Sequence, residues 1–167
     1  KDPSECTILV VGLGNRGVTP DSLGPQVASR IYVTRHIKKF MPDALDFPTA
    51  GVCAIAPGVL GITGVETADI VKGVVEKTSP DVIIAIDSLA SRRAARISTT
   101  VQLSDTGISP GSGVGNLRSE LSKNSLGIPV IAIGVPLVVY ASTISQDTIG
   151  MIADETGLHN DEEKLKS

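Results

Sequence analysis

Short aliphatic runs alternate along the chain with stretches in which apolar residues recur at helical spacing. The runs are rich in Val, Ile and Leu, which is typical of strands covered on both faces. They predict strands at residues 7–13, 52–56, 81–86 and 129–135, and an alternation with Thr and Gln predicts an edge strand at 97–103. The helical spacing predicts one helix that begins at 21 or 22 and others that span 65–77, 117–123 and 143–153.

This alternation favours the α/β fold class, as a three-layer α/β/α arrangement with a mostly parallel central sheet. The chain has 167 residues, about the size of one domain. We therefore expect a single α/β domain at residues 1–153 and a polar C-terminal tail at 154–167. Segments rich in Gly and Pro at 41–51, 57–64 and 104–116 are expected to be loops.

Composition and charge indicate how the core is built and which partners and compartment the chain fits. The chain is 41% hydrophobic but only 2% aromatic and has no Trp, so its core must consist of Val, Ile, Leu and Ala. The net charge of -3 argues against nucleic acid as a partner, and the apolar runs are too short to cross a membrane. The basic clusters Lys38–Lys39 and Arg92–Arg93 are expected to be solvated. Cys6 and Cys53 lie far apart and fit a reducing, cytoplasmic compartment.

Two aspartates each follow an aliphatic run closely. Asp21 lies beyond the glycine-rich loop after the first expected strand, and Asp87 comes directly after the run at 81–86. Because the carboxyl ends of parallel strands share one edge of a sheet, both side chains are expected at that edge, where α/β folds bind ligands. Two carboxylates there are the minimum apparatus for hydrolysis by an activated water. The alternative is that each Asp only caps a helix.

Two further motifs resemble known sites. Gly12, Gly14 and Gly17 satisfy the G-x-G-x-x-G pattern, but Pro20 intervenes before the helix, and the next strand ends without an acid for a ribose. We expect no nucleotide cofactor, although a nucleotide-binding domain stays open as a third reading. Asp105-Thr106-Gly107 matches the motif of pepsin-like proteases, which are all-β, and is interpreted here as a turn.

Several longer blocks carry a more specific resemblance, to the spore germination protease family of endopeptidases. They run from about residue 7 to residue 149 and comprise Leu9-Val10-Val11-Gly12-Leu13-Gly14-Asn15 with Val18-Thr19-Pro20-Asp21, Val33-Thr34-Arg35-His36, Ala56-Pro57-Gly58-Val59, Gly64-Val65-Glu66-Thr67, Ile84-Ala85-Ile86-Asp87, Ser104-Asp105-Thr106-Gly107-Ile108 with the glycine-rich run at 110–116, and the segment 127–136.

The resemblance implies an endopeptidase of an atypical aspartic type, with Asp21 and Asp87 as its catalytic residues. It implies a fold similar to that of the hydrogenase-maturation endopeptidases, which place acidic residues and a His around a metal ion. Many family members carry His where this chain has Ser109, and neither His36 nor His159 is expected beside the aspartates. We therefore expect no metal and no cofactor.

The family also implies partners. Its substrates are small acid-soluble spore proteins, degraded in the spore core during germination, and its members are longer zymogens with an N-terminal propeptide. They form homo-oligomers, possibly tetramers, for which we expect the loops at 41–51 and 57–64 to supply apolar surface. Two alternatives stay open: a weakly active or inactive homologue that serves as a binding or scaffold domain, and a metal-assisted endopeptidase of the maturation type.

Overall fold

The fold is built on one five-stranded sheet, seen in a computed structural model that describes residues 2–45, 47–110 and 119–157. The strands lie in the order β2-β1-β3-β5-β4, and all neighbours are parallel except β4 and β5. Their bounds are β1 Thr7–Gly12, β2 Gly51–Ile55, β3 Val82–Ser91, β4 Gln102–Ser104 and β5 Val130–Val139. The mostly parallel sheet of an α/β fold is thereby confirmed.

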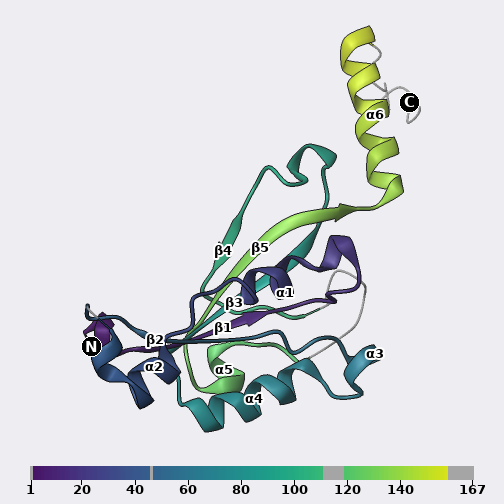
Figure 1. Cartoon of the computed structure of the whole chain (residues 1–167). Coiled ribbons are helices and arrows are strands. Elements are labelled where there is room, and N and C mark those ends of the chain that lie inside the picture. Colours follow the sequence, from purple (N-terminus) through teal and green to yellow (C-terminus); the bar gives the residue numbers. More distant parts are fainter. Residues whose placement is uncertain (1, 46, 111–118, 158–167) are drawn as a thin grey trace.

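Helices surround this sheet (Figure 1). The α-helices are α1 Leu23–Ala28, α2 Arg35–Phe40, α3 Leu60–Thr63, α4 Thr67–Thr78, α5 Lys123–Leu126 and α6 Ala141–Thr156. Four short 3₁₀ turns complete the described elements: η1 Pro3–Glu5, η2 Thr19–Asp21, η3 Pro42–Ala44 and η4 Ala94–Arg96.

The main core lies between the sheet and α4. Val71 and Val75 of α4 are buried against alternate residues of the central strands, including Leu9 and Val11 of β1 and Ile83 of β3. The helix ends at Thr78, and its C-cap residue Ser79 adopts a left-handed conformation before Pro80. The helix expected at 65–77 is therefore confirmed, because its apolar spacing is the spacing that the sheet requires.

Helix α1 covers the opposite face of the sheet at very short range. A Cβ atom at Gly12 of β1 would lie 2.1 Å from the carbonyl oxygen of Gly24 in α1. A Cβ at Gly24 would lie 2.5 Å from the carbonyl oxygen of Ile86 in β3. The two glycines thus let the helix backbone touch the ends of both central strands. The helix ends at Ala28.

Strands β3 and β5 are longer than the sequence predicts. They were expected to end at 86 and 135, yet their pairing continues to Ser91 and Val139, with a register shift between Leu89 and Ala90. Backbone hydrogen bonds form this ladder, so a polar side chain such as that of Asp87 does not end it. The edge strand β4 is correspondingly shorter than the expected 97–103.

Two helices differ from expectation. α5 begins at Lys123, because Ser122 and Ser125 form a capping box there; the expected helix at 117–123 is thus displaced, and its residues 117 and 118 lie outside the described part. α6 begins at Ala141 and ends at Thr156, inside the segment expected as a polar tail, of which residues 158–167 also lie outside the described part. Within the described ranges, every helix is too short or too polar to cross a bilayer.

Candidate active site

Asp87 occupies a buried position in the central strand β3. Its side chain is only 7% exposed, and it lies one residue beyond Ile86, where the pairing of β3 with β1 ends. The backbone N–H of Ser88 donates a hydrogen bond to Oδ1 of Asp87 at 2.8 Å. The strand therefore holds a carboxyl group in a fixed position just past the end of β1, where only β3 and β5 continue as a pair.

Two neighbours of Asp87, Gly134 and Leu89, are apolar or lack a side chain. Gly134 of β5 pairs with Asp87 across the ladder, and a Cβ atom at this glycine would lie 2.3 Å from Cδ1 of Leu89. Side chains two residues apart share one face of a strand, so Leu89 lies on the same face as Asp87. Leu89 thereby covers the residue opposite Asp87 and helps to exclude water from the carboxyl.

Asp21 reaches the same region from the loop that follows β1. It is the last residue of η2 and is partly buried. The backbone N–H of Asn15 donates a hydrogen bond to Oδ2 of Asp21 at 2.7 Å. Gly14 has a φ of 112°, and a Cβ there would lie 2.1 Å from the carbonyl oxygen of Asp21. The glycine-rich loop thus wraps around this aspartate.

The loop that carries Asp21 is attached to the strand that carries Asp87. The N–H of Leu13 donates to the carbonyl of Ile86 at 2.8 Å, and η2 lies against both β3 and β5. Burial raises the pKa of Asp87 to about 6; the Ser88 hydrogen bond lowers it, and the negative charge of Asp21 raises it further. The two carboxyl groups therefore interact electrostatically.

Neither aspartate caps a helix. Asp21 accepts its hydrogen bond from Asn15, which precedes it by six residues, and α1 is preceded by Ser22, whose side chain makes no capping bond. Asp87 lies inside a strand that continues for four more residues. The capping interpretation of both residues is wrong, and each carboxyl has its own fixed position next to the strand ends.

Such a pair is suited to acid-base chemistry. A carboxyl group whose pKa is about 6 stays protonated up to a higher pH than an exposed Asp does. It can therefore donate a proton to a leaving group. A partly exposed carboxylate next to it can receive a proton from water. Two carboxyls with different surroundings can therefore supply one proton donor and one proton acceptor.

The other candidates from the sequence lie elsewhere. His36 belongs to α2, whose neighbour is β2 at the edge of the sheet, and His159 lies outside the described residues. Asp105 is exposed in the loop after β4. Over the described ranges, no group of three or more His, Cys, Asp or Glu side chains is placed so that it could hold a metal ion.

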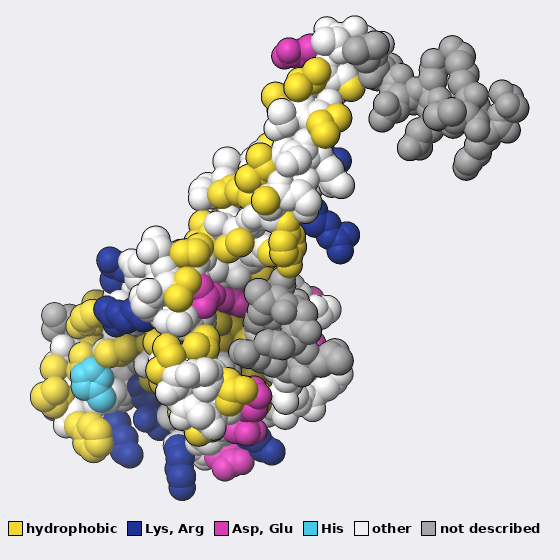
Figure 2. Space-filling model, turned by 90° about the vertical axis from the view of Figure 1, so that its right-hand side faces the viewer, with side chains coloured by type: hydrophobic (Ala, Val, Ile, Leu, Met, Phe, Trp, Pro, Cys, Tyr) yellow, Lys and Arg dark blue, Asp and Glu magenta, His cyan; other side chains and the backbone are white. Residues whose placement is uncertain are grey.

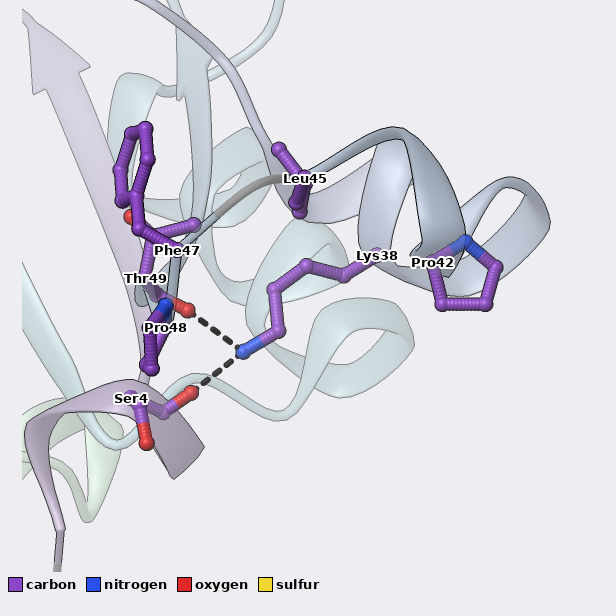
Figure 3. Close-up of a pocket in the computed structure, with 7 residues that line it drawn as sticks. All are labelled: Ser4, Lys38, Pro42, Leu45, Phe47, Pro48 and Thr49. Carbon is purple, nitrogen blue, oxygen red and sulfur yellow. Dashed lines mark hydrogen bonds between the residues drawn. The ribbon is translucent and has the colours of Figure 1, made fainter.

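A hollow of about 400 Å³ lies away from the aspartates, at the end of the sheet where the strands begin (Figure 3). Lys38 points into it, and its Nζ donates to the carbonyl oxygens of Ser4 and of Thr49, the latter at 2.7 Å. Lys38 thus ties the N-terminal turn to the segment before β2 and is not solvated as expected, whereas Lys39, Arg92 and Arg93 are exposed. The Nζ atom of Lys38 is thereby engaged in contacts with backbone carbonyls.

The sequence missed the glycines that make the site compact. Gly24 and Gly134 each stand where a side chain would collide with the backbone of Ile86 or the side chain of Leu89. A glycine inside a predicted helix or strand signals such a close approach, and this is the cue that would have found them.

Comparison with known proteins reveals close sequence relatives. The model of a family described as germination protease matches residues 3–167. The germination protease of Clostridium perfringens is 58% identical over 153 residues, which make up 92% of this chain and 47% of that protein. The germination protease of Caldanaerobacter subterraneus is 57% identical over 158 residues, or 95% of this chain and 49% of the relative. The chain spans about half the length of these relatives.

A solved structure supports the fold. The NiFe hydrogenase maturation protease HycI from Thermococcus kodakarensis superposes with a TM-score of 0.50 over 90% of this chain and 92% of its own. The two sequences are 16% identical, so the likeness concerns the fold alone. The expected similarity in fold to the maturation endopeptidases is confirmed.

Proposed function

Because the chain belongs to the germination protease family, we propose that it is the peptidase part of an endopeptidase, with Asp21 and Asp87 as its catalytic pair. The observation that carries this proposal is the unequal pair itself. One carboxyl is buried with a pKa of about 6, the other is partly exposed, and their charges interact. Nothing in the folding of a strand requires an acid at 87, and its burial costs stability.

The surroundings of the two carboxyls suggest their functions. Asp21 accepts a proton from a water molecule whose oxygen bonds to the carbonyl carbon of the scissile peptide. Asp87 donates its proton to the leaving nitrogen as the C–N bond breaks, which yields a free amine and a carboxylic acid that loses its proton to solvent. The next cycle requires the proton to return from Asp21 to Asp87, and the proximity of the two groups favours this return.

The wider biology of the chain is also part of this proposal. The family supports spore proteins as substrates and germination as the process, with small acid-soluble spore proteins as the specific class and the spore core as the location. An N-terminal propeptide that keeps the enzyme as a zymogen and assembly into a homo-oligomer rest on the resemblance described above.

Substitution of each carboxyl tests the proposal. Asp21→Asn and Asp87→Asn are each expected to lower the rate of cleavage of a spore-protein peptide by at least about 10²-fold, because each removes one half of the acid-base pair. Asp105→Asn is the matched control, since it removes an equal charge from an exposed loop position. Circular dichroism verifies that all three variants are folded. Cleavage close to the wild-type rate by either site variant would overturn the assignment.

A further inference from the structure

The side chain of Asn15 is held in a fixed orientation beside Asp21. The backbone N–H of Asn15 donates to Oδ2 of Asp21 at 2.7 Å, and the side-chain Oδ1 of Asn15 accepts a hydrogen bond from the N–H of Gly17 at 2.9 Å. Because a backbone N–H can only donate, the second bond fixes the amide oxygen of the side chain towards Gly17. The NH₂ group of the same amide is thereby directed away from this contact.

This NH₂ group has hydrogens to spare. Within the described ranges, Nδ2 of Asn15 donates to no other group, and the residue is partly exposed. Backbone donors nearby are already engaged. The N–H of Ser88 binds the carboxyl of Asp87, and the N–H of Leu13 binds a strand carbonyl. The side-chain amide of Asn15 is therefore a preoriented donor next to the aspartate pair.

The loop that carries Asn15 lies at an accessible side of the molecule. Residues 16–20, which follow Asn15, are all exposed. The side towards which β1 points, at the right of Figure 1, faces the viewer in Figure 2, and acidic side chains are visible on its surface. A peptide can thus approach the loop and the aspartates from the same side.

Hydrolysis by two carboxyls requires a further donor. When the water oxygen bonds to the carbonyl carbon, one electron pair of the C=O bond moves onto the carbonyl oxygen, which becomes negatively charged. Asp21 takes a proton from the water and Asp87 gives one to the nitrogen, so neither carboxyl donates to this oxyanion. Fixed N–H donors aimed at an oxyanion are among the largest single contributions to acyl transfer. An uncharged amide provides them without forming an ion pair with Asp21.

We propose, on the basis of the function proposed above, that Asn15 is a catalytic residue whose NH₂ group donates to the carbonyl oxygen of the scissile peptide. The base lies within about 3 Å of the attacking water, and the oxyanion donor within about 3 Å of the carbonyl oxygen. The two groups must therefore be close without contact. Asn15 meets this condition, because its backbone N–H binds Asp21 and its Nδ2 is four covalent bonds further on. The amide releases the oxygen when the C=O bond re-forms and the C–N bond breaks.

Substitution of Asn15 separates this function from a structural one. Asn15→Ser removes the NH₂ group without adding charge, and its hydroxyl can still accept from the N–H of Gly17. We expect kcat for a spore-protein peptide to fall by about 10²–10³-fold with little change in KM, because the oxyanion exists only in the transition state. Asn124→Ser is the matched control, the same change at an exposed position of α5 before β5 begins, and should cleave at the wild-type rate.

Two inhibitors provide a second readout. A phosphinate peptide carries a charged oxygen on a tetrahedral phosphorus, where the intermediate carries its oxyanion. A peptide whose scissile carbonyl is reduced to a methylene group has no such oxygen. Asn15→Ser is expected to weaken binding of the phosphinate by about the same factor as kcat/KM, and to leave binding of the reduced peptide unchanged. Isothermal titration calorimetry measures both affinities.

Each outcome decides between the two proposals. Cleavage close to the wild-type rate by Asn15→Ser, while Asp21→Asn and Asp87→Asn are inactive, would overturn the assignment of Asn15 alone. Equal losses of affinity for both inhibitors would also overturn it, because they would indicate a displaced loop. Asn15→Asp keeps the acceptor for Gly17 and lacks the donor, so a folded and fully active Asn15→Asp would overturn it equally. Cleavage by the two aspartate variants would instead refute the proposed function itself.

Discussion

Replacing Asp87 by Asn is expected to change how the stability of the fold depends on pH. Burial raises the pKa of Asp87 from 3.8 to about 6 in the folded protein, whereas the unfolded chain exposes the carboxyl. Between these two values the folded state holds a proton that the unfolded state has lost, so the free energy of unfolding falls as the pH rises. The two pKa values, 3.8 and about 6, correspond to a loss of about 3 kcal/mol at pH 7.

An Asn side chain does not ionise and can keep the hydrogen bond from Ser88 through its amide oxygen. The Asp87→Asn variant is therefore expected to be more stable than the wild type at pH 7, by up to about 3 kcal/mol, and equally stable near pH 3. The greater stability would accompany a loss of activity, as is common where a functional group is held in an unfavourable environment.

Urea unfolding followed by circular dichroism, at intervals from pH 3 to pH 7.5, measures this difference. Asp105→Asn is the control for the loss of one negative charge at an exposed position, and the dependence of its stability on pH should follow that of the wild type. The reasoning would be refuted if Asp87→Asn and the wild type showed the same dependence on pH. It would also be refuted if the variant were the less stable protein at pH 7.

Two further predictions concern the neighbours of this carboxyl. Asp21→Asn is expected to lower the pKa of Asp87, because it removes the negative charge that helps to raise this pKa. Carbon-13 NMR of the Asp87 carboxyl measures the change, and an unchanged pKa would mean that the two groups do not interact. Gly24→Ala is expected to lower the free energy of unfolding by about 1–3 kcal/mol or more, because its Cβ would lie 2.5 Å from the carbonyl oxygen of Ile86. Gly73→Ala is the control: its Cβ would meet open space, so it should stabilise α4 by up to about 1 kcal/mol. Equal effects of the two alanines in urea unfolding would contradict this view of the packing.

The sequence predicted the elements whose side chains repeat with the period of a buried face. Strand β1 and helix α4 are examples, because Leu9 and Val11 alternate along the strand and Val71 and Val75 are one helical turn apart. In both cases the same residues determine the local structure and the core. The placement of Asp87 next to the end of β1 follows equally from the parallel sheet, whose strands end along a common edge.

Other features depend on contacts that no periodicity encodes. The continuation of β3 through Asp87 results from its ladder with β5, and an acid within a strand gives no sign of that pairing. The hydrogen bond between Asn15 and Asp21 depends on the path of an irregular glycine-rich loop. Helix α2 was missed because its polar sequence has little apolar period, and Lys38 holds it in place through backbone carbonyls.

The pH dependence of kcat/KM for cleavage of a spore-protein peptide tests most directly whether Asp87 is the proton donor of a catalytic pair. Because the buried carboxyl must carry a proton to protonate the leaving nitrogen, the rate is expected to fall as the pH rises through about 6. The free enzyme's essential groups determine this profile, so the midpoint should agree with the pKa of Asp87 measured by NMR. A rate that stays level or increases through this range, in a folded and active enzyme, would contradict the account.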